Sequence, residues 1–177
     1  MKTYAVLLRG INVGGRNTLP MAELRTLLQA LGCEHVQTYI QSGNVVLRSP
    51  ATAAALAREI ARAIHEHHGF TPHVLVLEAS EVTAAMDANP FAEHASDPKS
   101  VHFGLLDSVP PNPDLDGLYA IRAPSERFDL KERVFYLHAP DGIGRSKLAA
   151  RSEALLGVPM TDRNLRTMSK IVAMLNS

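Results

Sequence analysis

The sequence predicts an α+β protein with two tandem ferredoxin-like (α/β-plait) subdomains packed together and a C-terminal helix. Two observations lead to this fold class. Apolar runs and helical patterns follow the order β-α-β-β-α-β over residues 4–78, which is the split-βαβ plan. A similar order then partly recurs in the rest of the chain. The 177 residues, 46% of them hydrophobic and 20% charged, suit one domain of ordinary size or two small ones.

The first ferredoxin-like subdomain is expected over residues 1–79. Short apolar runs bounded by glycine or polar residues predict strands over residues 4–9, 36–40, 45–48 and 71–78. The Gln-Ser-Gly-Asn sequence of residues 41–44 predicts the turn of a hairpin between the second and third of these strands. Apolar side chains at intervals of three and four residues predict a helix over residues 20–31. A second helix is expected to open with Ser49 and Pro50 and to end at Gly69.

The boundary between the subdomains is expected in residues 80–98, which hold a linking helix over residues 80–87 and two proline turns. The second, less regular ferredoxin-like subdomain is expected over residues 99–177. Its strands are predicted over residues 101–106, within 119–130, over 133–138 and around 159–163. Its helices are predicted near residues 114–118, over 146–156 and over 164–175.

Composition and charge restrict the function classes. The formal net charge is zero, which argues against a protein that coats nucleic acid with a basic face. Residues 51–120 are acidic and both flanking segments are basic, a pattern that serves either solubility or an anion-binding face. The single cysteine, Cys33, rules out a disulfide within the chain. No apolar run is long enough for a membrane helix and no signal-peptide pattern opens the sequence, so we expect a cytoplasmic protein.

The most informative loop joins the first strand to the first helix, over residues 10–17. Glycine allows backbone N–H groups to approach a ligand, a helix N-terminus favours an anion, and arginine grips phosphate or carboxylate. The alternative is a plain turn that needs positive φ at its two adjacent glycines. The candidate ligand-binding residues in and beside this loop are Arg9, Gly10, Asn12, Gly14, Gly15 and Arg16.

The expected topology places further residues relative to this loop. We interpret the first and third strands as parallel neighbours, so Arg9, Arg16 and Arg48 are expected to converge at one edge of the sheet. The hairpin tip is then expected at the opposite edge, away from any site that these arginines form. Its polar residues Gln41, Ser42 and Asn44 are candidates for contact with the second subdomain or with a ligand at the interface.

A second loop, over residues 141–147, also joins a strand to a helix. Its glycines and helix start are typical of a nest for a negative group, and the alternative is a turn followed by a helix cap. The candidate residues are Gly144, Arg145, Ser146 and Lys147. A third candidate segment contains Arg163 and Asn164. Arg163, Arg166 and Lys170 recur at helical spacing and are expected to form a solvated stripe or to join the second loop in a basic site.

No metal site and no cofactor are expected. The cluster His65-Glu66-His67-His68 lies in the predicted last helical turn, where histidine suits the helix dipole, and no spaced third ligand accompanies it. His102 and His138 fall in predicted strands as ordinary strand residues. Cys33 has no basic neighbour in the sequence, and no nucleophile–base pair is apparent, so the sequence leaves open whether the protein is an enzyme.

Four sequence strings together resemble one bacterial family. They are Leu8–Gly15, Thr38–Asn44, Asp141–Lys147 and Thr161-x-Arg163-Asn164. They occur in order across nearly the whole chain and resemble the family of domain of unknown function 1697 (DUF1697). The resemblance implies two packed ferredoxin-like subdomains and supplies no catalytic residues, because the family has no established activity. The family pattern often has an aromatic residue after the Arg-Asn pair, whereas Leu165 stands there in this chain.

The sequence therefore favours a cytoplasmic protein that binds a small anionic ligand, either a nucleotide or another phosphate, at its glycine- and arginine-rich loops. Three alternatives stay open. The first is nucleic-acid binding, which the absence of tryptophan and the 5% aromatic content disfavour. The second is an enzyme that acts on a phosphorylated substrate. The third is a protein-interaction module. The oligomeric state does not follow from the sequence.

Overall fold

The computed structural model describes residues 1–177, which divide into two compact units. The first unit contains Met1–Ala84 together with Lys170–Ser177, and the second contains Ala85–Ser169. This division differs in two respects from the expected ranges 1–79, 80–98 and 99–177. The expected linking segment is divided between the two units after Ala84. The last eight residues, expected in the second subdomain, belong to the first unit. None of the helices combines the length and the apolar character needed to cross a membrane.

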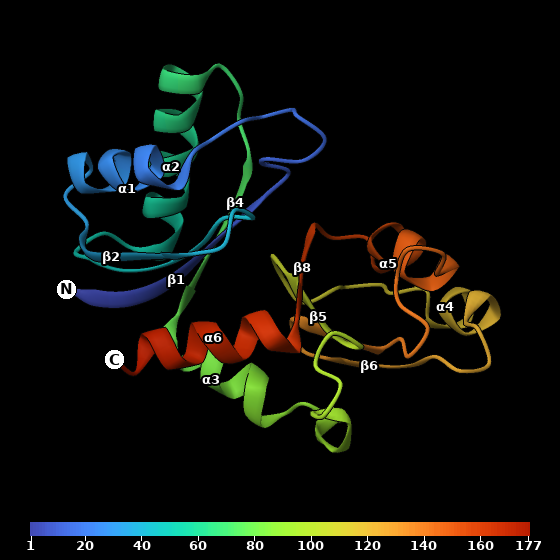
Figure 1. The fold of residues 1–177 in the computed structure, drawn as a ribbon. Coiled ribbons are helices and arrows are strands. Elements are labelled where there is room, and N and C mark those ends of the chain that lie inside the picture. Colours follow the sequence, from blue (N-terminus) through green and yellow to red (C-terminus); the bar gives the residue numbers. More distant parts are fainter. The chain divides into compact units, whose positions relative to one another are not determined.

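The first unit is a four-stranded antiparallel sheet with two helices (Figure 1). Its strand order is β2-β3-β1-β4. The elements follow the predicted sequence: β1 (Lys2–Arg9), α1 (Met21–Ala30), β2 (Glu34–Tyr39), β3 (Asn44–Ser49), α2 (Ala53–His68) and β4 (His73–Glu78). This order and pairing confirm the ferredoxin-like plan.

The core of this unit lies between the sheet and the two helices. Alternate side chains of β1 and β3 face the helices, as the period of two in a strand requires. The apolar stripes of α1 and α2 pack against them. The largest fully buried members of this core include Tyr4, Leu8, Leu19, Leu24, Leu28, Leu47, Leu56 and Ile60.

Helix α2 begins later than the sequence indicated. We expected Ser49 to cap it, but Ser49 is the last residue of β3 and pairs with Lys2 in the sheet. The N-cap is Thr52, whose side chain accepts a hydrogen bond from the N–H of Ala55 at 3.2 Å. The expected end of the helix is confirmed, because Gly69 adopts the left-handed conformation with a φ of 79°.

The direction of β3 corrects the expected position of Arg48. Strand β1 pairs with β3 in the antiparallel direction, with Leu7 opposite Asn44 and Thr3 opposite Arg48. Arg48 therefore lies at the other end of β1 from Arg9, and the expected convergence with Arg9 and Arg16 is wrong. The physical reason is the hairpin, since it reverses the chain between β2 and β3.

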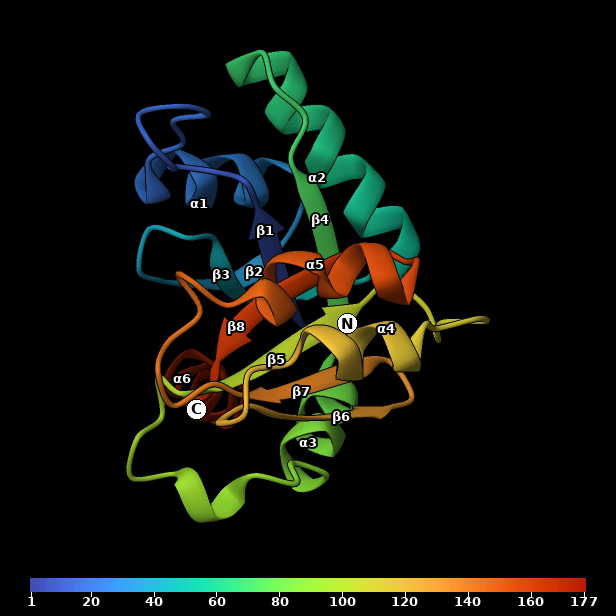
Figure 2. The ribbon, with the colours of Figure 1, turned by 90° about the vertical axis from the view of Figure 1, so that its right-hand side faces the viewer.

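The second unit repeats the same plan in full. Its sheet has the order β6-β7-β5-β8 and is also antiparallel. The helices α4 and α5 lie on the same side of this sheet (Figure 2). The elements are β5 (Val101–Leu106), α4 (Leu115–Ile121), β6 (Arg127–Lys131), β7 (Val134–His138), α5 (Lys147–Leu156) and β8 (Met160–Asn164). The expected irregularity is limited to size, since α4 has 7 residues whereas α1 has 10.

Two helices and one short turn complete the chain. Helix α3 (Ala79–Asp87) and a 3₁₀ turn, η1 (Ala92–His94), stand between β4 and β5, where a linking helix was predicted. Helix α6 (Leu165–Leu175) follows β8. Within the second unit, the Tyr136 hydroxyl donates a hydrogen bond of 2.6 Å to the carbonyl of Ala85. Burial, aided by the charge of Asp129, raises the pKa of Tyr136 to about 12.

Candidate anion-binding site

The loop between β1 and α1 has a backbone that few residue types adopt. Gly10, Asn12, Gly14, Gly15 and Asn17 all have positive φ, between 51° and 80°. The two central glycines form a tight turn that closes when the N–H of residue 16 donates to the carbonyl of residue 13 at 3.0 Å. Glycine has little penalty in this conformation, and asparagine tolerates it. The positive φ at Gly14 and Gly15 that the plain-turn alternative requires is present.

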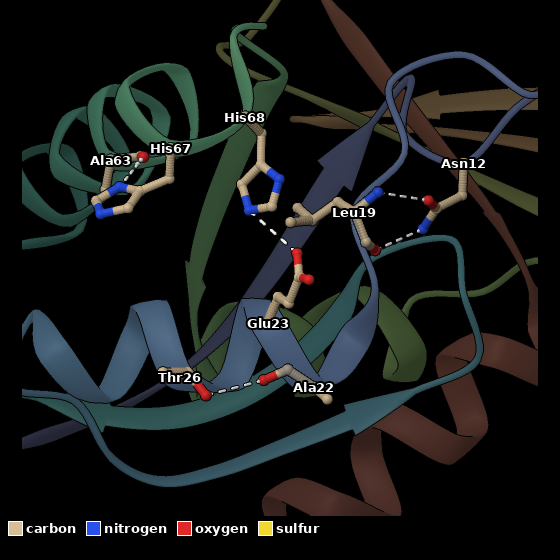
Figure 3. A network of polar contacts seen from close by, with 8 residues as sticks. All are labelled: Asn12, Leu19, Ala22, Glu23, Thr26, Ala63, His67 and His68. Atoms are coloured by element: carbon tan, nitrogen blue, oxygen red, sulfur yellow. Dashed lines mark hydrogen bonds and ion pairs between the residues drawn. The ribbon is translucent and has the colours of Figure 1, made fainter.

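Asn12 connects this loop to the hairpin tip. Its Nδ2 donates to the carbonyl of Leu19 at 2.9 Å and to the carbonyl of Gln41 at 2.8 Å. Its Oδ1 accepts a hydrogen bond from the N–H of Leu19 at 2.7 Å, and Figure 3 shows the paired contacts with Leu19. The loop and the hairpin tip therefore lie at the same edge of the sheet. The expectation that the tip lies at the opposite edge is wrong, for the same reason as the misplaced Arg48.

The hairpin tip itself is held by buried contacts. Asn44 is fully buried, and its Nδ2 donates to the carbonyl of Tyr39 at 3.1 Å and to Oγ of Ser42 at 2.9 Å. Gly43 has a φ of 87°, and its carbonyl accepts from the N–H of Leu8 at 2.9 Å. A Cβ on Gly43 would lie only 2.6 Å from Cβ of Leu8. Asn44 and Ser42 therefore shape the tip, which explains their place in the sequence without a ligand.

The groups left for a ligand are few, and none of them carries a negative charge. Gly14, Gly15, Arg16 and Gln41 are exposed. The guanidinium of Arg16 makes no hydrogen bond or ion pair within the chain, and the N–H groups of Gly14 and Gly15 have no backbone acceptor. Residues 9–19 and 40–44 contain two arginines and no carboxylate. This edge of the first unit combines exposed N–H donors with the positive charge of the exposed Arg16 side chain.

The second loop has a different electrostatic setting. Ser146 caps α5 by accepting from the N–H of Ala149 at 3.0 Å, and its hydroxyl donates to Oε2 of Glu126 at 2.5 Å. Glu126 is only 4% exposed, and its other oxygen accepts from the N–H of Ala123 at 2.8 Å. Arg145 and Lys147 are exposed and have no partner in the chain. The hydroxyl proton of Ser146 is therefore donated to Glu126 and is not available to a ligand. The buried carboxylate of Glu126 lies beside the start of α5.

In the third candidate segment, Asn164 and Arg163 have different structural positions. Oδ1 of Asn164 accepts from the N–H of Thr167 at 3.0 Å and thereby caps α6. Arg163 lies on β8, before the helix begins, so the expected helical stripe of Arg163, Arg166 and Lys170 is wrong. Burial, partly offset by the charge of Asp162, lowers the pKa of Arg163 to about 10.

The sequence analysis missed an ionisable pair on the second sheet. Nδ1 of His102 donates to Oδ2 of Asp162 at 2.8 Å, and the His102 residue is 7% exposed. Asp162 also lines a cavity of about 90 Å³. The same cavity is lined by Ile143 of the second loop and Ser152 of α5. No spacing signal marks this pair, because its partners come from strands far apart in the sequence.

A cavity of the first unit was also missed. It measures about 540 Å³ and lies between α1 and α2. The available sequence signal was a row of small side chains, because Ala22, Thr26 and Ala30 recur every four residues and share one helix face. The cavity is lined by Ala22, Glu23, Thr26, Leu27, Ala30, Leu31, Ala63, His67 and His68.

The histidines near the end of α2 have separate partners. Nδ1 of His67 is 2.8 Å from the carbonyl of Ala63, and Nε2 of His68 is 3.5 Å from Oε2 of Glu23 (Figure 3). His65 contacts Oγ1 of Thr71 at 3.1 Å. The structure contains no group of three metal-ligating side chains.

A family model described as "Protein of unknown function (DUF1697)" matches residues 1–136. The matched segment is more than half of the chain. The chain belongs to the DUF1697 family. The resemblance to this family is thus confirmed over residues 1–136, which contain the first two of its four sequence strings. For this DUF1697 chain, burial raises the pKa of the Cys33 thiol, which disfavours a thiolate nucleophile.

A solved structure supports the fold of this DUF1697 chain. It is described as the conserved bacterial protein SP0830 from Streptococcus pneumoniae. The two proteins share 29% sequence identity, with 98% of each chain covered and a TM-score of 0.70. No curated protein matches the chain. The comparisons therefore establish family and fold, and the candidate site has to be argued from its own geometry.

Proposed function

We propose that this DUF1697 protein binds a small anionic ligand, a nucleotide or another phosphate, at the loop of residues 10–17. The observation that carries the proposal is the Asn12 contact. Its side chain joins the loop to the hairpin tip, so that Arg16 and Gln41 belong to one edge of the sheet. Arg9 precedes the same loop.

The chemistry of this edge suits an anion. Successive N–H groups in a glycine turn form a concave set of donors, and a planar guanidinium adds paired hydrogen bonds to phosphate or carboxylate. The N–H groups of Gly14 and Gly15 and the side chain of Arg16 supply these donors. The loop is fixed by internal hydrogen bonds, so less conformational entropy is lost when a ligand binds.

The loop of residues 141–147 is the weaker candidate. Arg145 and Lys147 offer positive charge, and Gly144 offers an exposed backbone. However, the carboxylate of Glu126 lies 2.5 Å from Oγ of Ser146, and a buried negative charge repels an incoming anion. We therefore assign the anion primarily to the first loop and use the second as the internal comparison.

Thermal unfolding of the full chain with a ligand panel tests the proposal. The panel contains nucleotides, sugar phosphates, inorganic phosphate, dicarboxylates and short single-stranded RNA. A ligand at 100 times its Kd should add about 2.7 kcal/mol to the free energy of unfolding. The shift should disappear in Arg16→Ala and persist in the matched variant Arg145→Ala.

Two outcomes would overturn this assignment. One is a ligand-induced shift that survives in Arg16→Ala, and the other is the absence of any shift across the panel. A shift with RNA alone that falls steeply with salt would instead favour nucleic-acid binding.

We also propose a cytoplasmic location. The argument is that the one cysteine, Cys33, is a buried free thiol and the fold contains no disulfide, as is usual in a reducing compartment. Cell fractionation with an antibody against the protein would test this location, and recovery from an extracellular or membrane fraction would contradict it.

A further inference from the structure

We propose that the cavity between α1 and α2 is a second ligand site, for a small organic molecule with an apolar body and an ammonium group. Its volume of about 540 Å³ lies in the usual range for small-molecule sites. None of its lining residues belongs to the loop of residues 10–17, so the inference is independent of the anion site.

The apolar part of the site comes from small and aliphatic side chains. Ala22, Ala30 and Ala63 are small side chains that leave space between the two helices. Leu27 and Leu31 form an apolar wall of the cavity. Leu27 and Ala63 belong to the apolar core of the unit or pack against it. An apolar ligand body would be removed from water here at a gain of about 25 cal/mol per Å² of buried surface.

The polar part of the site consists mainly of acceptors. The Glu23 carboxylate is 58% exposed, and its one ionic partner is Nε2 of His68 at 3.5 Å. Thr26 donates its hydroxyl proton to the carbonyl of Ala22 at 3.1 Å, so its oxygen lone pairs are available (Figure 3). The carbonyl of Ala63 accepts from Nδ1 of His67, so Nε2 is the ring nitrogen that remains for a ligand.

The charge of the lining decides the class of occupant. No lysine or arginine lines the cavity, and the one permanent charge is the carboxylate of Glu23. Nε2 of His68 lies 3.5 Å from Oε2 of Glu23, so this nitrogen faces a carboxylate. A cationic donor therefore matches the Glu23 carboxylate, whereas an anion would be repelled by it. This polarity is opposite to that of the edge around Arg16.

Binding of three matched probes to the full chain tests the inference. The probes are 2-phenylethylamine, 2-phenylethanol and 3-phenylpropionate, which share an aromatic body and differ in charge. Methyl-region NMR titration follows the signals of Leu27, Leu31 and the lining alanines. The amine should shift these signals, and the alcohol should bind at least about tenfold more weakly because it lacks the charged hydrogen bond.

Two variants separate charge from shape. Glu23→Gln retains the shape and should weaken amine binding about tenfold, whereas Ala30→Leu fills the cavity and should abolish it. Glu66→Gln on α2 removes a carboxylate that does not line the cavity and should leave binding unchanged. Because Ala30 is exposed on a helix, leucine is expected to be tolerated there, and Glu23→Gln does not depend on that tolerance.

Four ligand-binding results would overturn the inference. They are equal binding of all three probes, preferred binding of the carboxylate, no shift at millimolar amine, and amine binding that survives both Glu23→Gln and Ala30→Leu. Methyl shifts that depend on protein concentration alone would show that a second copy of the chain occupies the cavity. That outcome would likewise overturn it.

Discussion

Asp162 and His102 form a hydrogen bond of 2.8 Å across the pair of strands β5 and β8. His102 stands opposite Asn164 in the sheet and Gly104 stands opposite Asp162, so the two side chains are diagonal neighbours on one face. Burial lowers the pKa of His102, but the hydrogen bond to Asp162, the charge of Asp162 and a hydrogen bond with the backbone of Lys99 together raise it by more. The pKa of His102 is therefore above its ordinary value of 6.5.

This pair predicts a pH-dependent contribution to stability. Because the folded-state pKa of His102 is above the unfolded value of 6.5, the stabilisation is complete below pH 6.5 and is lost as the pH rises through the folded-state pKa. Asp162→Asn should remove it and lower the free energy of unfolding by about 1 kcal/mol at acidic pH, a small value because Asp162 is 37% exposed. Urea unfolding at several pH values measures the difference.

Two controls isolate this effect. His138 has a lowered pKa, because burial and the neighbouring His94 disfavour its charge, so its contribution has the opposite sign. It is common to both proteins and cancels in the difference. Asp116→Asn, on an exposed position of α4, should leave the pH profile unchanged. Parallel profiles for the wild type and Asp162→Asn would show that the pair does not titrate as described.

The Asn12 side chain should contribute more than any other to the stability of the loop that it joins to the hairpin tip. Asn12→Gly retains the positive φ and loses three hydrogen bonds, so we expect a loss of about 2 kcal/mol of stability. Asn12→Ala should cost about 1 kcal/mol more, because alanine is strained at positive φ. Denaturant unfolding compares the two variants with Asn112→Ala, an exposed asparagine. Equal stability of the glycine and alanine variants would contradict the backbone argument.

Gly43 and Gly14 both have positive φ, but only Gly43 lacks room for a side chain. Gly14→Ala should lose about 1 kcal/mol through backbone strain alone. Gly43→Ala adds a clash with Leu8 and should lose about 3 kcal/mol or more. Thermal unfolding of both variants measures the difference, and similar losses would mean that the hairpin tip adapts without cost.

The hydroxyl of Thr161 is fully buried and has no hydrogen-bond partner. An unsatisfied buried hydroxyl costs free energy, so Thr161→Val should raise the free energy of unfolding by about 1 kcal/mol. Thr161→Ser keeps the hydroxyl and removes a methyl group, and it should lower stability by about 1 kcal/mol. Chemical denaturation ranks the three proteins, and a destabilised valine variant would indicate a partner for this hydroxyl in solution.

The element order of the first unit was predictable because its signals are local. Apolar alternation, Gly69 as a helix end and the turn of residues 41–44 each depend on neighbouring residues. Strand direction is not local. It depends on how many times the chain reverses between β1 and β3. We expected these strands to be parallel, and Arg48 and the hairpin tip were misplaced for that reason. The start of α2 was misplaced for a similar reason, because pairing with Lys2 keeps Ser49 in the sheet.

The candidate site was predictable in residue type but not in role. Asn12, Asn44 and Ser146 are polar residues in glycine-rich loops, and the same side chains suit a ligand or the protein's own backbone. The structure shows that they satisfy backbone groups. No single-sequence pattern separates the two roles, because the hydrogen-bond partners of Asn12 and Ser146 come from residues up to 29 positions away.

The discontinuous first unit has a consequence for biosynthesis. Met174 and Leu175 line a cavity together with Thr3 and Arg48, yet the ribosome adds them only after the whole of Ala85–Ser169. The second unit is contiguous and has all its residues once Ser169 has emerged. The unit that is translated first is therefore the last to be completed. In the nascent chain, its sheet lacks the contacts with Met174 and Leu175 until Lys170–Ser177 have been synthesised.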